Sequence, residues 1–200
     1  MSRRVAIVRV AAPFVAGFLV ALAVGWLALP RLLYQRIEQP LQFSHALHTS
    51  DEVGQSCDGC HTFDADGRFA GIPAIENCAT CHSEMLGESE SERRLVEDYV
   101  QKGREIPWLV YARQPDTAFF PHTRHLRLAE LPCERCHGTH GGTTTLRPYE
   151  RNRLTGYSRD VWGRSISGFA TAEWDGMKMG DCTNCHRQSG IAESCLDCHR

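Results

Sequence analysis

The 200-residue sequence lacks a strong excess of charge of either sign, and its apolar residues are unevenly distributed. The formal net charge is −2, which argues against nucleic-acid binding, because proteins of that class present a basic face. Hydrophobic residues make up 42% of the chain, but many of them lie in one N-terminal run. The remainder is polar and holds most of the 17 Gly and 9 Pro. We therefore expect a loop-rich domain that cannot build a large aliphatic core.

The N-terminal run carries no charged residue from Val10 to Leu29. A helix of this length spans about 30 Å, the thickness of the hydrocarbon layer of a membrane. We therefore predict a transmembrane helix over residues 10–29. The arginines within residues 1–9 should stay in the cytoplasm, which places everything after Pro30 on the periplasmic side of the inner membrane.

A cleaved signal peptide is the alternative interpretation of this run. Ala21-Leu22-Ala23 resembles a cleavage site, but a signal peptide normally ends its apolar stretch before that point. The run continues through Trp26 and Leu27, which favours an uncleaved anchor. Both interpretations predict export.

No cysteine is left over when the ten cysteines are grouped into Cys-x-x-Cys-His motifs. The motifs consist of Cys57, Cys60 and His61; Cys78, Cys81 and His82; Cys133, Cys136 and His137; Cys182, Cys185 and His186; and Cys195, Cys198 and His199. Two thiols three positions apart can form thioethers with both vinyl groups of one haem, and the following His supplies the proximal nitrogen to the iron. We therefore predict five covalently bound haem c groups.

Cysteine pairs at this spacing have two other common uses. The pairs Cys57/Cys60 and Cys78/Cys81 are spaced as in a zinc ribbon, and an exported chain could instead form disulfides. Neither alternative requires a histidine after the second cysteine of all five pairs, so the sequence favours haem.

The other five histidines are candidates for the distal side of the irons. The pattern Phe-x-His-x-x-His occurs at residues 43–48 and again at residues 120–125, each time upstream of a haem motif. Histidines at this spacing lie one helical turn apart on neighbouring faces, so each can bind a different haem. The predicted distal ligands are His45, His48, His122 and His125.

The fifth distal ligand has two candidates. His140 follows the proximal His137 by three residues, and the number of histidines favours it. Met179 precedes Cys182 by three residues and would give its haem a higher potential than a bis-histidine haem. In either case every iron can be six-coordinate, which leaves no open position for a substrate. The sequence therefore predicts an electron relay without catalytic residues.

The haem motifs divide the rest of the chain into segments. These are a dihaem module (residues 31–83), a helical connector (84–105), a monohaem module (106–142), a region rich in Arg and aromatic residues (143–176) and a C-terminal dihaem module (177–200). Ser89 and Glu92 fit a capping box at the start of the connector helix. The region 143–176 either wraps the haems, with arginines on the propionates, or forms a docking surface for a partner subunit.

Several short segments resemble known cytochromes. The Phe-x-His-x-x-His pairs resemble the cytochrome c3/c7 class. A more specific similarity covers residues 40–138 and 177–199 and points to the pentahaem cytochrome c subunit of alternative complex III, with the multihaem subunit of the periplasmic quinone-reductase complex as a nearby relative. The segments that carry it are Ala70-Gly71-Ile72-Pro73, Ile106-Pro107-Trp108 with Tyr111, Pro115-Asp116, Phe119-Phe120 and Met179-Gly180.

This resemblance implies a mostly α and irregular fold with a haem-filled core. It implies partners of two kinds, an iron–sulfur or molybdopterin-type subunit and polytopic quinone-binding membrane subunits. It also implies quinol oxidation, a monohaem or soluble cytochrome as the electron acceptor, and Met179 as the fifth distal ligand. The alternatives are a relay subunit of a quinone reductase or sulfur-compound reductase, and a multihaem enzyme that reduces nitrite or a similar oxyanion.

Overall fold

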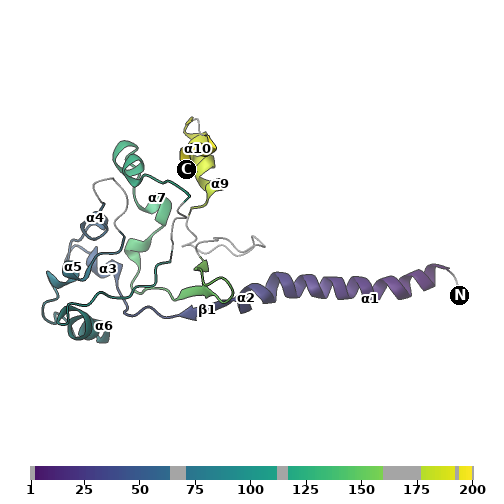
Figure 1. Cartoon of the computed structure of the whole chain (residues 1–200), viewed down its shortest axis with the longest axis horizontal. Helices are drawn as coiled ribbons and strands as arrows, with labels where there is room; N and C mark the ends of the chain where they lie inside the picture. Colours follow the sequence, from purple (N-terminus) through teal and green to yellow (C-terminus); the bar gives the residue numbers. More distant parts are fainter. Residues whose placement is uncertain (1–2, 64–70, 112–116, 160–176, 192–193, 200) are drawn as a thin grey trace.

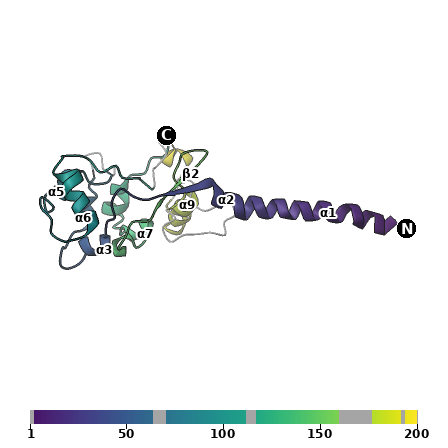
Figure 2. The same cartoon turned by 90° about the horizontal axis from the view of Figure 1, so that it is seen from below.

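The structure, a computed structural model, describes residues 3–63, 71–111, 117–159, 177–191 and 194–199. A long N-terminal helix projects from a small domain built of short helices and loops (Figure 1). Figure 2, seen from below, shows the helix leaving the domain in the same way. The protein is thus mostly irregular and helical. The predictions for residues 160–176, which include Trp162, Phe169 and Trp174, lie outside the described residues.

The N-terminal helix begins as α1 (Arg3–Ala23) and continues through a π-helical segment, η1 (Val24–Ala28), into α2 (Leu29–Leu33). It therefore extends beyond both ends of the predicted segment 10–29. The stretch Ala11–Ala28 has a mean hydropathy of 2.1, and none of it is buried inside the molecule. An apolar helix of this length without a packing partner in its own chain is suited to a membrane or to a signal sequence.

A two-stranded sheet joins the base of this helix to the domain. Strand β1 (Tyr34–Ile37) pairs antiparallel with β2 (Tyr149–Asn152), with Tyr34 opposite Asn152 and Ile37 opposite Tyr149. Across the sheet, Arg36 Nε lies 3.3 Å from a carboxylate oxygen of Glu150. The sheet brings residues more than 110 positions apart in sequence together where the helix enters the domain.

The described part of the domain contains ten further helical segments. They are α3 (His45–His48), α4 (Cys57–Cys60), α5 (Ile75–Ala79), α6 (Glu90–Arg94), η2 (Leu95–Val100), η3 (Arg124–Leu128), α7 (Glu134–His137), η4 (His140–Gly142), α9 (Met179–Gln188) and α10 (Cys195–Cys198). Most are one or two turns long, so they gain little stability from their own hydrogen bonds.

The side-chain core of the described residues is small and lies at one end of the domain. Leu41, Ile75, Tyr99 and Ile106 form it, and Cys78 packs against it. Tyr99 belongs to the segment predicted as a connector, so this segment contributes to the core as well as linking two modules. The rest of the domain is ordered around histidines and cysteines rather than around aliphatic side chains.

The connector helix begins at its predicted residue. Ser89 Oγ accepts a hydrogen bond from Glu92 N at 3.1 Å, as an N-cap should. The reciprocal half of the predicted capping box is wrong, because the Glu92 carboxylate turns away from the Ser89 backbone. It accepts instead from Leu86 N at 2.6 Å, and its second partner belongs to a haem motif.

Candidate haem-binding sites

Each Cys-x-x-Cys-His motif forms a turn of helix. In four motifs the backbone N of the His donates to the carbonyl of the first Cys, with N–O distances of 2.8 Å for His61, 2.9 Å for His82, 3.0 Å for His137 and 2.9 Å for His199. The fifth motif lies within α9. Residues i, i+3 and i+4 share one face of a helix, so every turn presents two thiols and an imidazole to the same side.

The two Phe-x-His-x-x-His segments have nearly the same internal geometry. Phe43 stacks on His48 with ring centroids 4.3 Å apart, and Phe120 stacks on His125 at 4.4 Å. Each second histidine also hydrogen-bonds through Nδ1 to the carbonyl four residues earlier, at 2.8 Å for His48 and 3.1 Å for His125. Because Nδ1 is engaged, the opposite nitrogen, Nε2, is the one left to bind a metal.

Three of the four predicted distal histidines face a proximal histidine across a gap. The ring centroids are 6.2 Å apart for His48 and His82, 6.3 Å for His122 and His137 and 6.1 Å for His125 and His186. With a metal–imidazole bond of about 2.0 Å, two imidazoles that bind one metal from opposite sides have centroids roughly 6 Å apart. These three pairs therefore fit a six-coordinate haem iron between the rings.

The fourth distal candidate, His45, lies next to the proximal His61. Burial lowers the pKa of His45 to about 4, and the nearby His61, His140 and His48 add to this effect. The His45 Nδ1 hydrogen-bonds to the Thr143 hydroxyl at 3.1 Å. A metal ligand must be the neutral imidazole, and this environment holds His45 in that form.

A carboxylate contacts one of the predicted proximal histidines. Glu92 Oε1 lies 3.2 Å from Nδ1 of His82, and the two side chains are only 13% and 19% exposed. By contrast, Nδ1 of the proximal His61 lies 3.2 Å from the carbonyl of Gly71. A carboxylate on the far nitrogen of a ligating imidazole raises the basicity of the ligand. The sequence alone indicates only a capping role for Glu92, because nothing in the local pattern links it to a histidine ten residues earlier.

The thiols of different motifs lie close to one another. Burial is the main cause of the raised pKa of Cys78, and the neighbouring Cys60 adds to it. Burial likewise raises the pKa of Cys133, and Cys57 adds to it. In the same way Cys185 raises the pKa of Cys136. Cys198 is among the neighbours that raise the pKa of Cys182. The second motif thus neighbours the first, the first neighbours the third, the third neighbours the fourth, and the fourth neighbours the fifth.

The two candidates for the fifth distal position occupy different parts of the domain. His140 lies in η4, which is tied to α3 by hydrogen bonds from Ala46 N to Thr143 O at 2.9 Å and from Thr49 Oγ1 to Gly141 O at 3.0 Å. This places His140 beside His45. Met179 opens α9, is 66% exposed, and stands one turn before Cys182, the neighbour of the last motif.

The structure also bears on the zinc and disulfide alternatives. All ten cysteines are free. Within the described part of the chain, no three Cys, His, Asp or Glu side chains converge on a point where they could hold a metal ion. Opposed pairs of imidazoles would suit the iron of a haem, which takes one ligand on each face of the macrocycle. A structural zinc site instead requires four converging ligands.

Comparison with known proteins identifies a relative along nearly the whole length. No model of a protein family matches the chain. The chain is 38% identical to the multihaem cytochrome c subunit of the menaquinone reductase of Nitratidesulfovibrio vulgaris, over 95% of this chain and 90% of the relative.

Proposed function

Because the chain belongs to the family of the multihaem cytochrome c subunits of menaquinone reductases, we propose that it relays electrons to the quinone-reducing membrane subunits of such a complex. The observation that carries this proposal is the set of opposed imidazole pairs, each beside a Cys-x-x-Cys-His turn. Haem iron held in this way supplies one-electron redox chemistry without an open coordination position.

The proposed ligand set covers five haems. The cysteines of the five motifs form the thioethers, and the proximal ligands are His61, His82, His137, His186 and His199. The proposed distal ligands for the first four are His45, His48, His122 and His125, respectively. For His199 we propose Met179, because α9 adjoins the last motif through Cys182 and Cys198, whereas His140 lies beside His45.

We further propose that the binding sites form a single row in the order second, first, third, fourth, fifth motif. The neighbouring thiols support this order, and the two histidine pairs support it independently. Helix α3 carries ligands for the first and second sites on His45 and His48. The segment 120–125 carries ligands for the third and fourth sites on His122 and His125. One turn of chain thus ties each of these adjacent pairs of sites together.

The direction of electron flow distinguishes two related complexes. The similarity to a menaquinone reductase subunit favours the quinone-reducing alternative over the quinol oxidation implied by the resemblance to alternative complex III. In the proposed complex this chain accepts electrons from an exported donor such as a soluble cytochrome. The expected partners are an iron–sulfur or molybdopterin-type subunit and polytopic membrane subunits that bind the quinone.

The N-terminal helix is proposed as an uncleaved anchor. Ala11–Ala28 is apolar and makes no buried contact with its own chain, and it joins the domain through β1. The domain then lies on the periplasmic face of the inner membrane, where an exported electron donor can reach it.

The experiment that tests the proposed direction uses the complex purified through this subunit. A reduced soluble multihaem cytochrome is mixed with the complex and a water-soluble menaquinone analogue, and oxidation of the donor is followed optically. We expect donor oxidation that depends on both the complex and the quinone. Quinol-driven reduction of an oxidised cytochrome, with no activity in the quinone-reducing direction, would instead identify a quinol-oxidising complex.

A further inference from the structure

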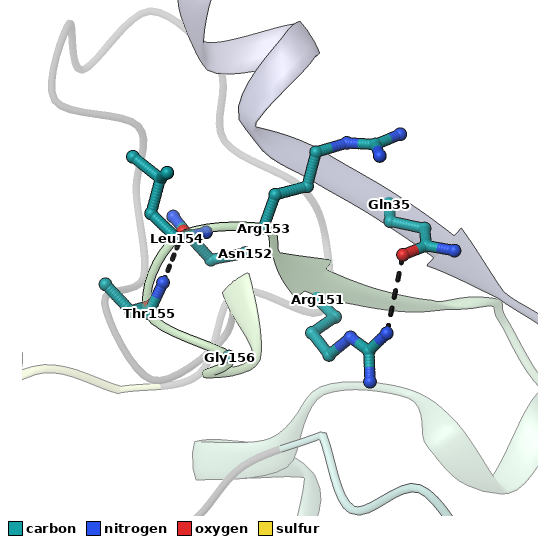
Figure 3. A pocket seen from close by; sticks show the side chains of 7 residues that line it. All are labelled: Gln35, Arg151, Asn152, Arg153, Leu154, Thr155 and Gly156. Carbon is teal, nitrogen blue, oxygen red and sulfur yellow. Dashed lines mark hydrogen bonds between the residues drawn. The ribbon is translucent and has the colours of Figure 1, made fainter.

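A short turn stands at the point where the N-terminal helix enters the domain. It comprises residues 153–157 and follows directly after strand β2. Arg153 N donates a hydrogen bond of 2.8 Å to the carbonyl of Leu33, the last residue of α2. Figure 3 shows this turn beside the base of the helix, with Arg151 and Gln35 on the paired strands next to it. The turn is therefore fixed to the helix rather than to the haem-binding part of the domain.

Hydrogen bonds within the turn hold its backbone although its side chains face outward. The side chain of Asn152 is buried, and its Oδ1 accepts hydrogen bonds from Leu154 N at 2.9 Å and Thr155 N at 3.1 Å. Asn152 N also donates to Tyr157 O at 2.8 Å, and Gly156 completes the turn with a φ of +75°. Despite this internal bracing, Leu154 is 81% exposed and Tyr157 is 57% exposed. The turn therefore leaves an apolar and an aromatic side chain uncovered by the rest of the chain.

Two arginines lie next to these exposed residues in the chain, Arg153 directly before Leu154 and Arg151 on strand β2. Arg151, Arg153 and Leu154 help to line an open cavity of about 540 Å³ together with Gln35 (Figure 3). Arg151 contacts the amide oxygen of Gln35 at 3.4 Å. In the part of the chain that the structure describes, neither Arg151 nor Arg153 pairs with a carboxylate. Figure 3 shows Arg153 directed toward the base of the helix and Arg151 directed to the other side of the strand, so each guanidinium can bind its own anionic oxygen ligand such as a phosphate.

The distance between the turn and the apolar stretch indicates that the phosphate of a lipid headgroup is within reach of the turn. The apolar stretch ends at Ala28, and five further helical residues advance the chain by about 7.5 Å to Leu33. The headgroup layer on each side of a membrane is roughly 5–8 Å thick. Because Arg153 is hydrogen-bonded to Leu33, the turn lies at the depth of the lipid headgroups when residues 11–28 span the hydrocarbon layer.

We propose that residues 151–157 form a membrane-surface anchor that binds the headgroups of anionic phospholipids. Arg151 and Arg153 bind lipid phosphate, while Leu154 and Tyr157 pack among the lipid headgroups. This inference rests on the membrane anchor within the proposed function, but not on the haem ligands or the direction of electron flow. The anchor fixes the height and orientation of the haem domain above the membrane.

Hydroxyl-radical footprinting of the haem-loaded full chain in lipid nanodiscs tests this anchor. Discs of phosphatidylcholine alone are compared with discs that contain phosphatidylglycerol, and side-chain oxidation is measured by peptide mass spectrometry. Leu128, which is 80% exposed and lies in the haem domain, is the internal reference. We expect several-fold slower oxidation of Leu154 than of Leu128, with a larger difference in the anionic discs.

A double variant, Arg151→Gln with Arg153→Gln, should lose the additional protection that phosphatidylglycerol gives. The matched control is Arg93→Gln with Arg94→Gln on α6, which should leave that protection unchanged. An unaltered haem absorption spectrum shows that both variants fold.

Three results would overturn the inference. If Leu154 oxidises as fast as Leu128 while the protein stays bound to the discs, the contact of the turn with lipid is rejected, and the transmembrane helix is not. Protection of Leu154 that requires the other subunits of the complex identifies a protein partner in place of lipid. If the chain does not remain with the discs, the transmembrane helix is rejected as well. Haem loading and quinone reduction are measured separately, so they test the rest of the proposed function independently.

Discussion

The two Phe-x-His-x-x-His segments have almost the same internal ring contacts, but they differ in their capping and in the residues around them. The Phe–His edge contacts have centroid distances of 4.9 Å for Phe43 and His45 and 4.8 Å for Phe120 and His122. The stacked contacts and the Nδ1 hydrogen bonds also agree between the two segments. The shared ring contacts and Nδ1 hydrogen bonds all lie within the six residues, so the orientation of the two imidazoles is largely a local property of this pattern.

The two segments differ in one internal helix cap and in one group that comes from elsewhere in the chain. The first segment begins at Ser44, whose hydroxyl accepts from Leu47 N at 3.2 Å; the second begins at Pro121 and has no such cap. His82, which faces the first segment, contacts Glu92, whereas His137, which faces the second, makes no ring hydrogen bond in the described residues. The comparison teaches that ligand placement is a local property, whereas adjustment of each site depends on distant residues.

The strongest test of this comparison removes one haem attachment from each region. Replacing Cys78 and Cys81 by Ser should lower the intact mass by one haem. It should also expose residues 71–106 to proteolysis, because Cys78 packs on the side-chain core. Replacing Cys195 and Cys198 should remove one haem with little effect on that region. Equal proteolysis of residues 71–106 in both variants would contradict the separate roles of the two regions.

Removal of a distal ligand should have the same effect in both segments. His48→Ala and His125→Ala should each convert one low-spin ferric haem to high spin, because each leaves one iron with a single axial imidazole. Electron paramagnetic resonance measures the high-spin fraction. His140→Ala, which alters a histidine outside the proposed ligand set, should produce no high-spin signal. A high-spin signal from His140→Ala and none from His125→Ala would reverse the assignment.

The role of Glu92 predicts a smaller effect that is confined to the first segment. Glu92→Gln removes a negative charge next to His82 and weakens the imidazole as a donor, so the ferric state loses stabilisation. The potential of one haem should rise by about 60 mV, which corresponds to a tenfold change in its redox equilibrium. Spectroelectrochemical titration measures this shift.

Glu90→Gln is the matched control for Glu92→Gln, because Glu90 lies on the same helix and pairs with Arg93 in an exposed ion pair. The control should leave all the potentials unchanged. Equal shifts in the two variants would indicate a general effect of surface charge and would remove Glu92 from the account.

The smallest predicted effect concerns the helix cap that only the first segment has. Ser44→Ala should lower the free energy of unfolding by about 1 kcal/mol, the usual contribution of an N-cap hydroxyl. Thermal unfolding followed by circular dichroism measures the change. Thr123→Ala in the second segment replaces a hydroxyl that caps no helix there and should have a smaller effect. A larger loss from Thr123→Ala would show that the cap is not what distinguishes the segments.

The parts of the structure that sequence predicts are those that a single turn of chain determines. A cysteine pair followed by histidine is chemically specific, and the spacing of His45 and His48 places them one turn apart in any helix. The contact of Glu92 with His82 and the neighbourhood of Cys57 and Cys133 could not be predicted, because both depend on how loops close. The sequence does not predict the pairing of β1 with β2 either, since neither short strand alternates clearly between apolar and polar residues.

The central claim is that opposed histidine pairs hold haem irons from both sides, and near-infrared magnetic circular dichroism of the oxidised, haem-loaded protein tests it directly. The ligand-to-metal bands of this spectrum distinguish bis-histidine from histidine–methionine haems. The account predicts low-spin haems throughout, four of them bis-histidine and one histidine–methionine. A spectrum dominated by high-spin haem, or one in which most haems lack a second histidine, would contradict it.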